Sequence, residues 1–212
     1  MESNLTPVLK VLIILLFIQL FTACSSSQSL TTATIHPSNT IDISSYKYLI
    51  GPGDSLNIFV WRNPEVSGVF VVRPDGMITT SLVEDIAVSG KTPTELARSV
   101  EKILSTYLRD PVVTVTVNNF IGPFSEQIRV IGEATEPKAI NYTQHMTLLD
   151  VMIQVGGLTV FADGNDAVLV RIEDGEQKKH DINIDKLLKD GDIAANVDML
   201  PGDIIIIPEA WF

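Results

Sequence analysis

Residues 92–117 read TPTELARSVEKILSTYLRDPVVTVTV, and two periodicities of apolar side chains follow one another in this stretch. The first part predicts a helix, because Thr92 is suited to cap it, Pro93 takes the first helical position and Glu95 completes a capping box. One helical face is then expected to be apolar throughout, with its side chains at Leu96, Val100, Ile103, Leu104, Tyr107 and Leu108.

The second periodicity predicts a strand. Asp110-Pro111 ends the helix, since the residue before a proline is disfavoured in the helical region. Valines then alternate with threonines from Val113 to Val117, the pattern of a strand with one buried face.

Short strands are predicted before the helix. The strand 55–61 follows the turn Gly51-Pro52-Gly53-Asp54, and the strand 69–73 leads into Pro74-Asp75-Gly76, a turn suited to a hairpin that residues 77–82 continue. Residues 46–122 are therefore expected to form one small, mostly-β domain.

A second unit is predicted from residue 123 to residue 208, after a joint at 121–125. Its helix, 148–155, is capped by Thr147 with Asp150 and is nearly all apolar, so we expect a sheet to enclose it. The strands expected around it span residues 127–132, 167–172, 177–184 and 204–207, with a single helical turn at 185–189 and a tail at 209–212. A sheet around one buried helix is a β-grasp arrangement, so the expected fold class is α+β with two mostly-β domains.

The segment Pro-Gly-Asp precedes a strand in both units, at 52–54 and 201–203. We interpret it as the same kind of turn used twice.

The first 45 residues carry a different signal. An apolar run, Val11 to Phe21, ends just before Cys24, the only cysteine of the chain, and is about half the length that spans a bilayer. Residues 20–24 resemble the lipobox of bacterial lipoproteins, which implies a signal peptide at 1–23, lipidation of Cys24 and, with Ser25 following, the outer membrane. The alternative is a cysteine buried in an ordinary helix. Residues 24–45 are rich in Ser and Thr and predict a flexible tether.

Composition excludes several classes of function. The net charge of −11 is a poor match for nucleic acid, which binds Lys and Arg through its phosphates. A single cysteine leaves no intramolecular disulfide and no cysteine-based metal site. The three histidines, His36, His145 and His180, have no metal-binding spacing, and residues 163–166 lack the glycine position of an EF-hand loop. We therefore predict no catalytic residues, no metal and no cofactor.

The order of these segments resembles the outer-membrane polysaccharide export family. The segments 48–56 (YLIGPGDSL), 72–76 (VRPDG) and 92–96 (TPTEL) are similar to its export domain. The segments 130–133 (VIGE), 147–149 (TLL), 156–157 (GG) and 200–203 (LPGD) are similar to the soluble ligand-binding β-grasp domain that follows it. Cys24 agrees, since members are commonly lipoproteins.

The resemblance implies a function in capsule or exopolysaccharide export. A ring of lipidated subunits would pass the polymer across the outer membrane, with an inner-membrane copolymerase as partner and the folded part in the periplasm. Full-length members add a second β-grasp domain and a terminal amphipathic helix, whereas this chain ends at Phe212, with a Trp-Phe ending like that of short members in exosortase-type systems. It is therefore open whether the protein forms the pore itself; a short member implies either a periplasmic ring beneath a separate outer-membrane β-barrel or a docking collar for other export parts.

Two other functions stay open. A monomeric glycan-binding accessory lipoprotein would use the β-grasp domain as a ligand site. A periplasmic enzyme would need paired carboxylates that flank a cleft, and the sequence nominates no such pair. Trp61 and Trp211 could stack on sugar rings, although a core or interface role for Trp61 is the alternative that tryptophan's large apolar surface favours.

Overall fold

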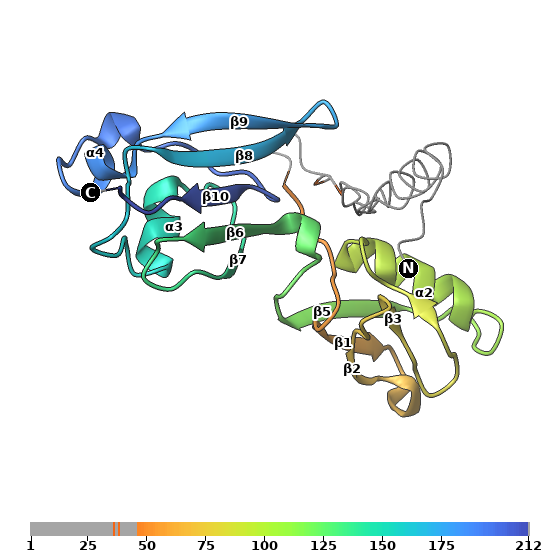
Figure 1. Ribbon diagram of the computed structural model, residues 1–212. Helices are drawn as coiled ribbons and strands as arrows, with labels where there is room; N and C mark the ends of the chain where they lie inside the picture. The colour runs from red at the N-terminus through yellow and green to blue at the C-terminus, as the bar shows by residue number, and fades with distance from the viewer. Residues whose placement is uncertain (1–35, 37, 39–45, 212) are drawn as a thin grey trace, which may run out of the picture. The chain divides into compact units, whose positions relative to one another are not determined.

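The computed structural model of the chain describes residues 36, 38 and 46–211 (Figure 1). Cys24, the signal peptide and most of the predicted tether lie outside the described residues. The described part has the expected α+β fold, since its mostly-β elements surround two separate hydrophobic cores, one in each half of the chain.

A three-stranded antiparallel sheet organises the first half. Its strands are β1 (Ser55–Val60), β2 (Gly68–Val71) and β5 (Val113–Asn119), in the order β2-β1-β5. Residues of β1 alternate between buried and outward positions, so Leu56, Ile58 and Val60 enter the core. The short 3-10 helix η3 (Pro64–Val66) connects β1 to β2.

Helix α2 (Pro93–Leu104) covers the core of this half. The predicted capping box is confirmed: the Glu95 N–H donates to Thr92 Oγ1 at 3.2 Å, and the Thr92 N–H donates to Glu95 Oε2 at 2.9 Å. The helix buries Leu96, Ala97, Val100 and Leu104.

The helix ends earlier than predicted. It stops at Leu104 instead of reaching Leu108, and Tyr107 is exposed rather than part of an apolar face. The hydroxyls of Ser105 and Thr106 donate to the carbonyls of Lys102 and Ile103. Such local side-chain bonds compete with helix continuation, which explains the early end.

The predicted turn at Pro74-Asp75-Gly76 is confirmed, since the Gly76 N–H donates to the Arg73 carbonyl and the Arg73 N–H donates to the Met77 carbonyl, both at 2.9 Å, but its continuation as a strand paired with β2 is wrong. Strand β3 (Met77–Ile78) does not continue alongside β2 but pairs with β4 (Ile86–Ala87), a strand that the sequence pattern did not reveal. The Gly76 carbonyl accepts the N–H groups of Val88 and Ser89, both at 3.0 Å, and these bonds hold β4 beside the turn.

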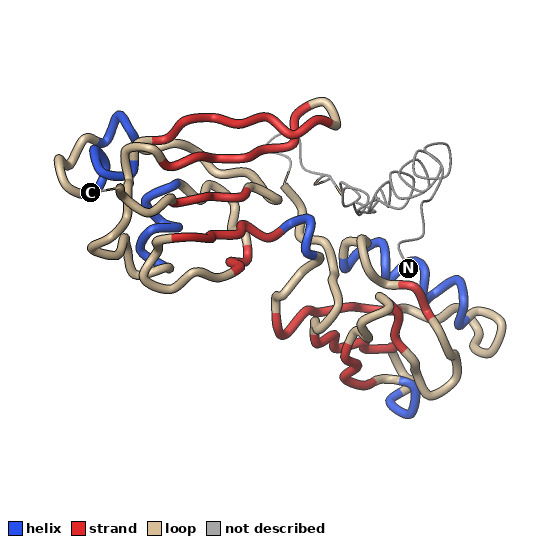
Figure 2. Tube along the Cα trace, in the orientation of Figure 1, coloured by secondary structure: helices blue, strands red, loops and turns tan. Residues whose placement is uncertain are grey.

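A five-stranded mixed sheet organises the second half, in the order β7-β6-β10-β8-β9 (Figure 2). Its strands are β6 (Gln127–Gly132), β7 (Ala139–Asn141), β8 (Ala167–Glu173), β9 (Glu176–Ile182) and β10 (Ile204–Ile207). The last strand of the chain is the central one: β10 pairs in parallel with β6 and antiparallel with β8. Strand β7, only three residues long, was not predicted.

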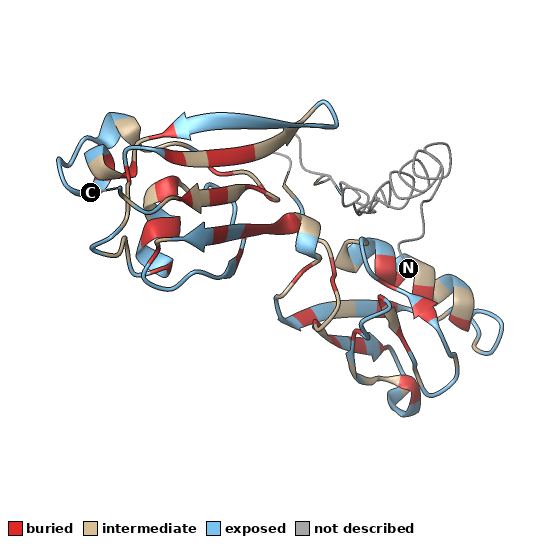
Figure 3. Cartoon of the chain, in the orientation of Figure 1, coloured by how far each residue is buried: buried red, intermediate tan, exposed pale blue. Residues whose placement is uncertain are grey.

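Helix α3 (Leu148–Gln154) packs against this sheet and buries Leu148, Val151 and Met152 (Figure 3). The expectation that it is enclosed on every side is wrong, because Ile153 is 68% exposed. The remaining helical segments are short: η4 (Phe124–Glu126), α4 (Ile184–Leu188) and η5 (Ile193–Ala195). Among the described residues, no helix has the length and apolar character needed to cross a bilayer.

Two tyrosines near the start of the described chain pack on different cores. Tyr46 contacts Tyr142 edge-on in the second half, with ring centroids 4.9 Å apart, and its hydroxyl donates to the Tyr142 carbonyl at 3.4 Å. Tyr48 packs on the first core and contacts Phe120, with ring centroids 5.1 Å apart. The chain that precedes the first sheet therefore contributes to the core of the second half as well.

Candidate functional site

The two Pro-Gly-Asp segments form the same turn. In each, the aspartate N–H donates to the carbonyl three residues before it at 3.2 Å, and the glycine has a positive φ, +91° at Gly53 and +88° at Gly202. This is a type II turn, with proline at its second position and glycine where a positive φ is required. In each, the aspartate carboxylate also accepts the N–H three residues before it, Gly51 at 2.9 Å and Leu200 at 2.7 Å.

The first turn is tied to the joint between the halves. Asp54 is fully buried, and its Oδ1 accepts the N–H groups of Ile121 at 2.7 Å and Gly122 at 3.0 Å. Its other oxygen accepts the Tyr48 hydroxyl at 2.6 Å. Burial, and then this hydrogen bond, raise the pKa of Tyr48 well above its usual value. A Cβ at Gly51 would lie 2.0 Å from the backbone of Gly122, so only glycine fits there.

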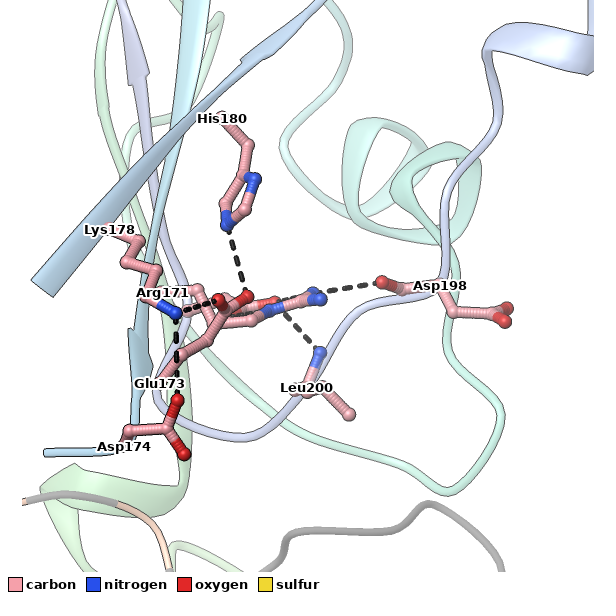
Figure 4. Close-up of polar contacts among 8 residues, drawn as sticks. Arg171, Glu173, Asp174, Lys178, His180, Asp198 and Leu200 are labelled. Atoms are coloured by element: carbon pink, nitrogen blue, oxygen red, sulfur yellow. Dashed lines mark hydrogen bonds and ion pairs between the residues drawn. The ribbon is translucent and has the colours of Figure 1, made fainter. Parts of the chain in front are cut away.

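The second turn is tied to an arginine. Asp203 is 1% exposed, and the Arg171 guanidinium donates to both of its oxygens, from Nε at 2.9 Å and from Nη2 at 2.7 Å. Arg171 Nη2 also donates to the Asp198 carbonyl at 3.0 Å (Figure 4). The negative charge of the buried Asp203 carboxylate is therefore balanced by the guanidinium, which donates to both of its oxygens. These hydrogen bonds raise the pKa of Arg171.

An exposed charge cluster lies beside this pair, on the hairpin of β8 and β9 (Figure 4). Glu173 bonds Lys178 at 3.0 Å and the His180 ring at 3.1 Å, while Lys178 also lies 3.6 Å from Asp174. The hydrogen bond from Lys178 lowers the pKa of Glu173 and raises the pKa of Lys178. These contacts make the cluster an exposed ion-pair network centred on Glu173 and Lys178.

The arginine of the VRPDG segment has a structural role. Arg73 bonds Asp75 in the turn and Asp85 at 2.6 Å, and the Met77 N–H donates to Asp75 Oδ1 at 3.2 Å. These bonds hold the loop that carries β3 and β4.

The outer face of the first sheet combines exposed apolar side chains with polar, uncharged ones. Opposite the core, Phe59 of β1 and Val69 and Val71 of β2 point outward and are exposed, and Trp61 follows directly after β1. The Phe59 and Trp61 rings contact edge-on, with centroids 6.3 Å apart. Beside them lie the polar, uncharged side chains of Asn57, Thr114 and Thr116. We call these residues, with Val112, the outer sheet face.

The histidines and the 163–166 segment, the candidates for metal-binding or catalytic residues, do not form a site together. His36 and His145 are exposed, and His180 belongs to the ion-pair network. Residues 163–166 form a turn in which Asp163 Oδ1 accepts the N–H groups of Asn165 and Asp166 at 3.1 and 3.3 Å. Across residues 36, 38 and 46–211 there is no group of three or more His, Cys, Asp or Glu side chains placed to hold a metal ion.

Trp61 is not a core residue, because it is 57% exposed. Its side chain belongs to the outer sheet face, an exposed surface that was not predicted from the sequence. The strict alternation of Leu56, Ile58 and Val60 with outward residues was the signal that could have located it.

A shallow pocket lies beside α4 and η5. Its volume is about 270 Å³, below the usual range of ligand pockets. The lining residues are Asp181, Ile182, Asn183, Lys186, Asp192, Ala194, Ala195 and Val197. It is too small and open to hold a drug-sized ligand.

Comparison with known families accounts for both halves of the chain. Residues 42–118 match the family described as polysaccharide biosynthesis/export protein, and residues 126–207 match the SLBB domain. The chain therefore combines a region similar to the polysaccharide biosynthesis/export family with a region similar to the SLBB domain. The two matches together contain both Pro-Gly-Asp turns, the outer sheet face and the Arg171–Asp203 pair.

Two curated relatives carry the same kind of name. The chain is 27% identical over 187 residues to the EPS I polysaccharide export outer membrane protein EpsA of Ralstonia nicotianae, with 76% of this chain and 47% of the relative covered. It is 28% identical over 182 residues to the protein of the same name from Ralstonia solanacearum, with 74% and 47% covered. The chain thus spans about half the length of the curated relatives that it matches.

Proposed function

We propose that this protein is a lipid-anchored, oligomeric component of a passage that carries an extracellular polysaccharide across the outer membrane. The observation that supports this most is the succession of an export domain at 42–118 and an SLBB domain at 126–207. The relatives that share this stretch are named polysaccharide export outer membrane proteins. Residues 1–23 act as the signal peptide, Cys24 receives the lipid, and residues 24–45 connect the anchor to domains in the periplasm.

The protein acts in this proposal without making or breaking a bond. Ionisable side chains that lie close together in the described domains form structural pairs, such as Arg171 with Asp203, or exposed networks, such as Glu173 with Lys178. A passage needs rigid walls and weak, repeated contacts, because a tight site would hold the polymer in transit. The family is one of export proteins, which agrees with a role that is not enzymatic.

The proposed partners are other copies of the chain, arranged in a ring, and an inner-membrane copolymerase that delivers the polymer. Light scattering and electron microscopy of the detergent-extracted, acylated protein test the ring. We expect closed rings with a central opening. A monodisperse monomer at all concentrations would contradict the ring and favour the monomeric glycan-binding accessory.

A deletion strain tests the role in export. We expect the strain to make the polymer but to retain it inside the cell envelope, and the wild-type gene to restore secretion. Unchanged secretion in the deletion strain would contradict the proposed function.

The anchor is tested separately with Cys24→Ala. This variant should lose palmitate labelling and leave the membrane fraction, while Ser25→Ala, the matched control at the next position, keeps both. Palmitate labelling that persists in Cys24→Ala would contradict lipidation at this residue.

A further inference from the structure

The outer sheet face has an exposed apolar centre. Phe59 is 47% exposed and Trp61 57%, and the neighbouring Val69, Val71 and Val112 are exposed to a similar degree. Scattered apolar residues on a surface are ordinary, but a contiguous group marks an interaction site. The two aromatic side chains are the largest of this group.

The polar side chains of the face lie in register with the aromatic ones. In the β1–β5 pairing, Phe59 lies opposite Thr114 and Asn57 lies opposite Thr116, so each pair shares one side of the sheet. Trp61 continues the row, since its N–H donates to the Val112 carbonyl at 2.9 Å. The two aromatic rings along β1 are therefore flanked by the amide of Asn57 on the same strand and by the hydroxyls of Thr114 and Thr116 on β5.

None of the residues that make up the face is charged, although the chain has a net charge of −11. A nucleic acid would require Lys or Arg on such a surface. A sugar ring, by contrast, presents an apolar C–H face that stacks on an aromatic ring and hydroxyl groups at its edge that bond Thr and Asn side chains. The Phe59 and Trp61 ring centroids are 6.3 Å apart, so both rings are within reach of neighbouring sugar rings of one extended polymer.

We propose that the outer sheet face binds polysaccharide, with Phe59 and Trp61 as stacking surfaces and Asn57, Thr114 and Thr116 as neutral hydrogen-bonding partners. That the ligand is the exported polymer rests on the proposed function. The residues of the face are exposed to solvent on strands rather than enclosed in a pocket, so binding is weak and the polymer can slide along it.

Affinity electrophoresis of the full chain tests this proposal. The native gel contains the extracellular polysaccharide purified from the source organism, and a gel without polysaccharide is the reference. The variants are Trp61→Ala and Phe59→Thr, and the matched control is Tyr107→Ala, which removes an exposed aromatic side chain that follows α2 and lies outside the outer sheet face. None of these changes alters the charge, so migration reports binding.

We expect the polysaccharide to retard the wild type and Tyr107→Ala equally. Each face variant should bind about 2- to 10-fold more weakly, the range of one aromatic contact, and the double variant should not be retarded. Absence of retardation in the wild type, or equal retardation of wild type and both face variants, would overturn the proposal.

Fluorescence adds a second readout, because the chain has two tryptophans. In Trp211→Phe, emission comes from Trp61 alone and should change as the same polysaccharide is added. In Trp61→Phe, emission comes from Trp211 and should stay constant. Constant Trp61 emission, or dissociation of an oligomer by Trp61→Ala in the absence of polysaccharide, would assign the face to another role. The proposed role in export is tested independently: unchanged secretion in the deletion strain would contradict it, whatever the outer sheet face binds.

Discussion

At the residue scale, two buried aspartates occupy the same turn and are compensated in different ways. Asp54 accepts three backbone N–H groups and a tyrosine hydroxyl, whereas Asp203 accepts one N–H and a bidentate guanidinium. A buried carboxylate without such partners is strongly unfavourable. Asp203 therefore depends on Arg171 more than Asp54 depends on any one of its donors.

Replacing Arg171 by leucine should lower the free energy of unfolding of the second half by about 3 kcal/mol, because Asp203 stays buried without its counter-charge. Urea denaturation followed by circular dichroism measures the change. Lys178→Leu is the control on the same sheet: it removes an exposed ion pair and should leave the denaturation midpoint nearly unchanged. Equal effects of the two variants would contradict the assigned role of Arg171.

The aspartates could be found from the sequence, but not their partners. Pro-Gly-Asp before a strand indicates the turn, and the structure confirms that both copies have the same geometry. Arg171 is 32 positions from Asp203, and Ile121 is 67 positions from Asp54. Such pairs depend on how the strands assemble, which local sequence patterns do not encode. Exposure of Trp61 is a different case, because the local alternation of buried and outward residues along β1 does indicate it.

At the element scale, the clearest sequence signals gave correct elements and the weaker ones did not. The capping box located the start of α2, and valine alternation located β5. Strands β4 and β7, with two and three residues, are too short for a period to be visible. The end of α2 was placed too late because apolar spacing continues to Leu108, although the chain beyond Leu104 is not helical.

Removing the cap of α2 with Thr92→Ala should cost about 1 kcal/mol, because the Glu95 N–H loses its acceptor. Thermal unfolding should show the midpoint of the first half about 5 °C lower. Ser99→Ala, an exposed hydroxyl on the same helix, is the control and should leave the midpoint close to that of the wild type.

The capping box of α2 makes the stability of the fold depend on pH. Hydrogen bonds from Thr92 lower the pKa of Glu95. A carboxyl with a lowered pKa stabilises the fold above its unfolded pKa, about 4.3, and this contribution disappears as the pH falls through the lower folded value. The wild type should therefore be more stable than Glu95→Gln at pH 7, and this difference should shrink below about pH 4. A difference that is constant with pH would contradict the capping role of the carboxylate.

At the scale of the whole molecule, the segment that enters the first sheet also completes the second core. Tyr46 packs on Tyr142, 96 positions away, and burial raises the pKa of Tyr46 to about 12. Its phenol is therefore neutral at physiological pH. The core of the second half therefore includes Tyr46, a residue that precedes the first half in the sequence.

Tyr46→Ala should therefore destabilise the second half by about 2 kcal/mol, although it lies before the first. Hydrogen exchange read by mass spectrometry separates the two halves: protection should fall in β6, β8 and β10 and stay constant in β1, β5 and α2. The matched variant Tyr48→Ala should show the opposite pattern, because Tyr48 packs on the first core. Loss of protection in the first half alone on Tyr46→Ala would contradict this assignment.

The central position of β10 has a consequence for folding kinetics. The β6–β7 and β8–β9 pairs connect segments close in sequence and can form early, whereas β10 joins β6 across more than 70 positions. Until Ile204–Ile207 inserts, both β6 and β8 present unpaired edges, which are templates for intermolecular pairing. The slowest step of folding is then also the step that protects the protein from aggregation, and a chaperone that shields these two edges would raise the yield of native protein.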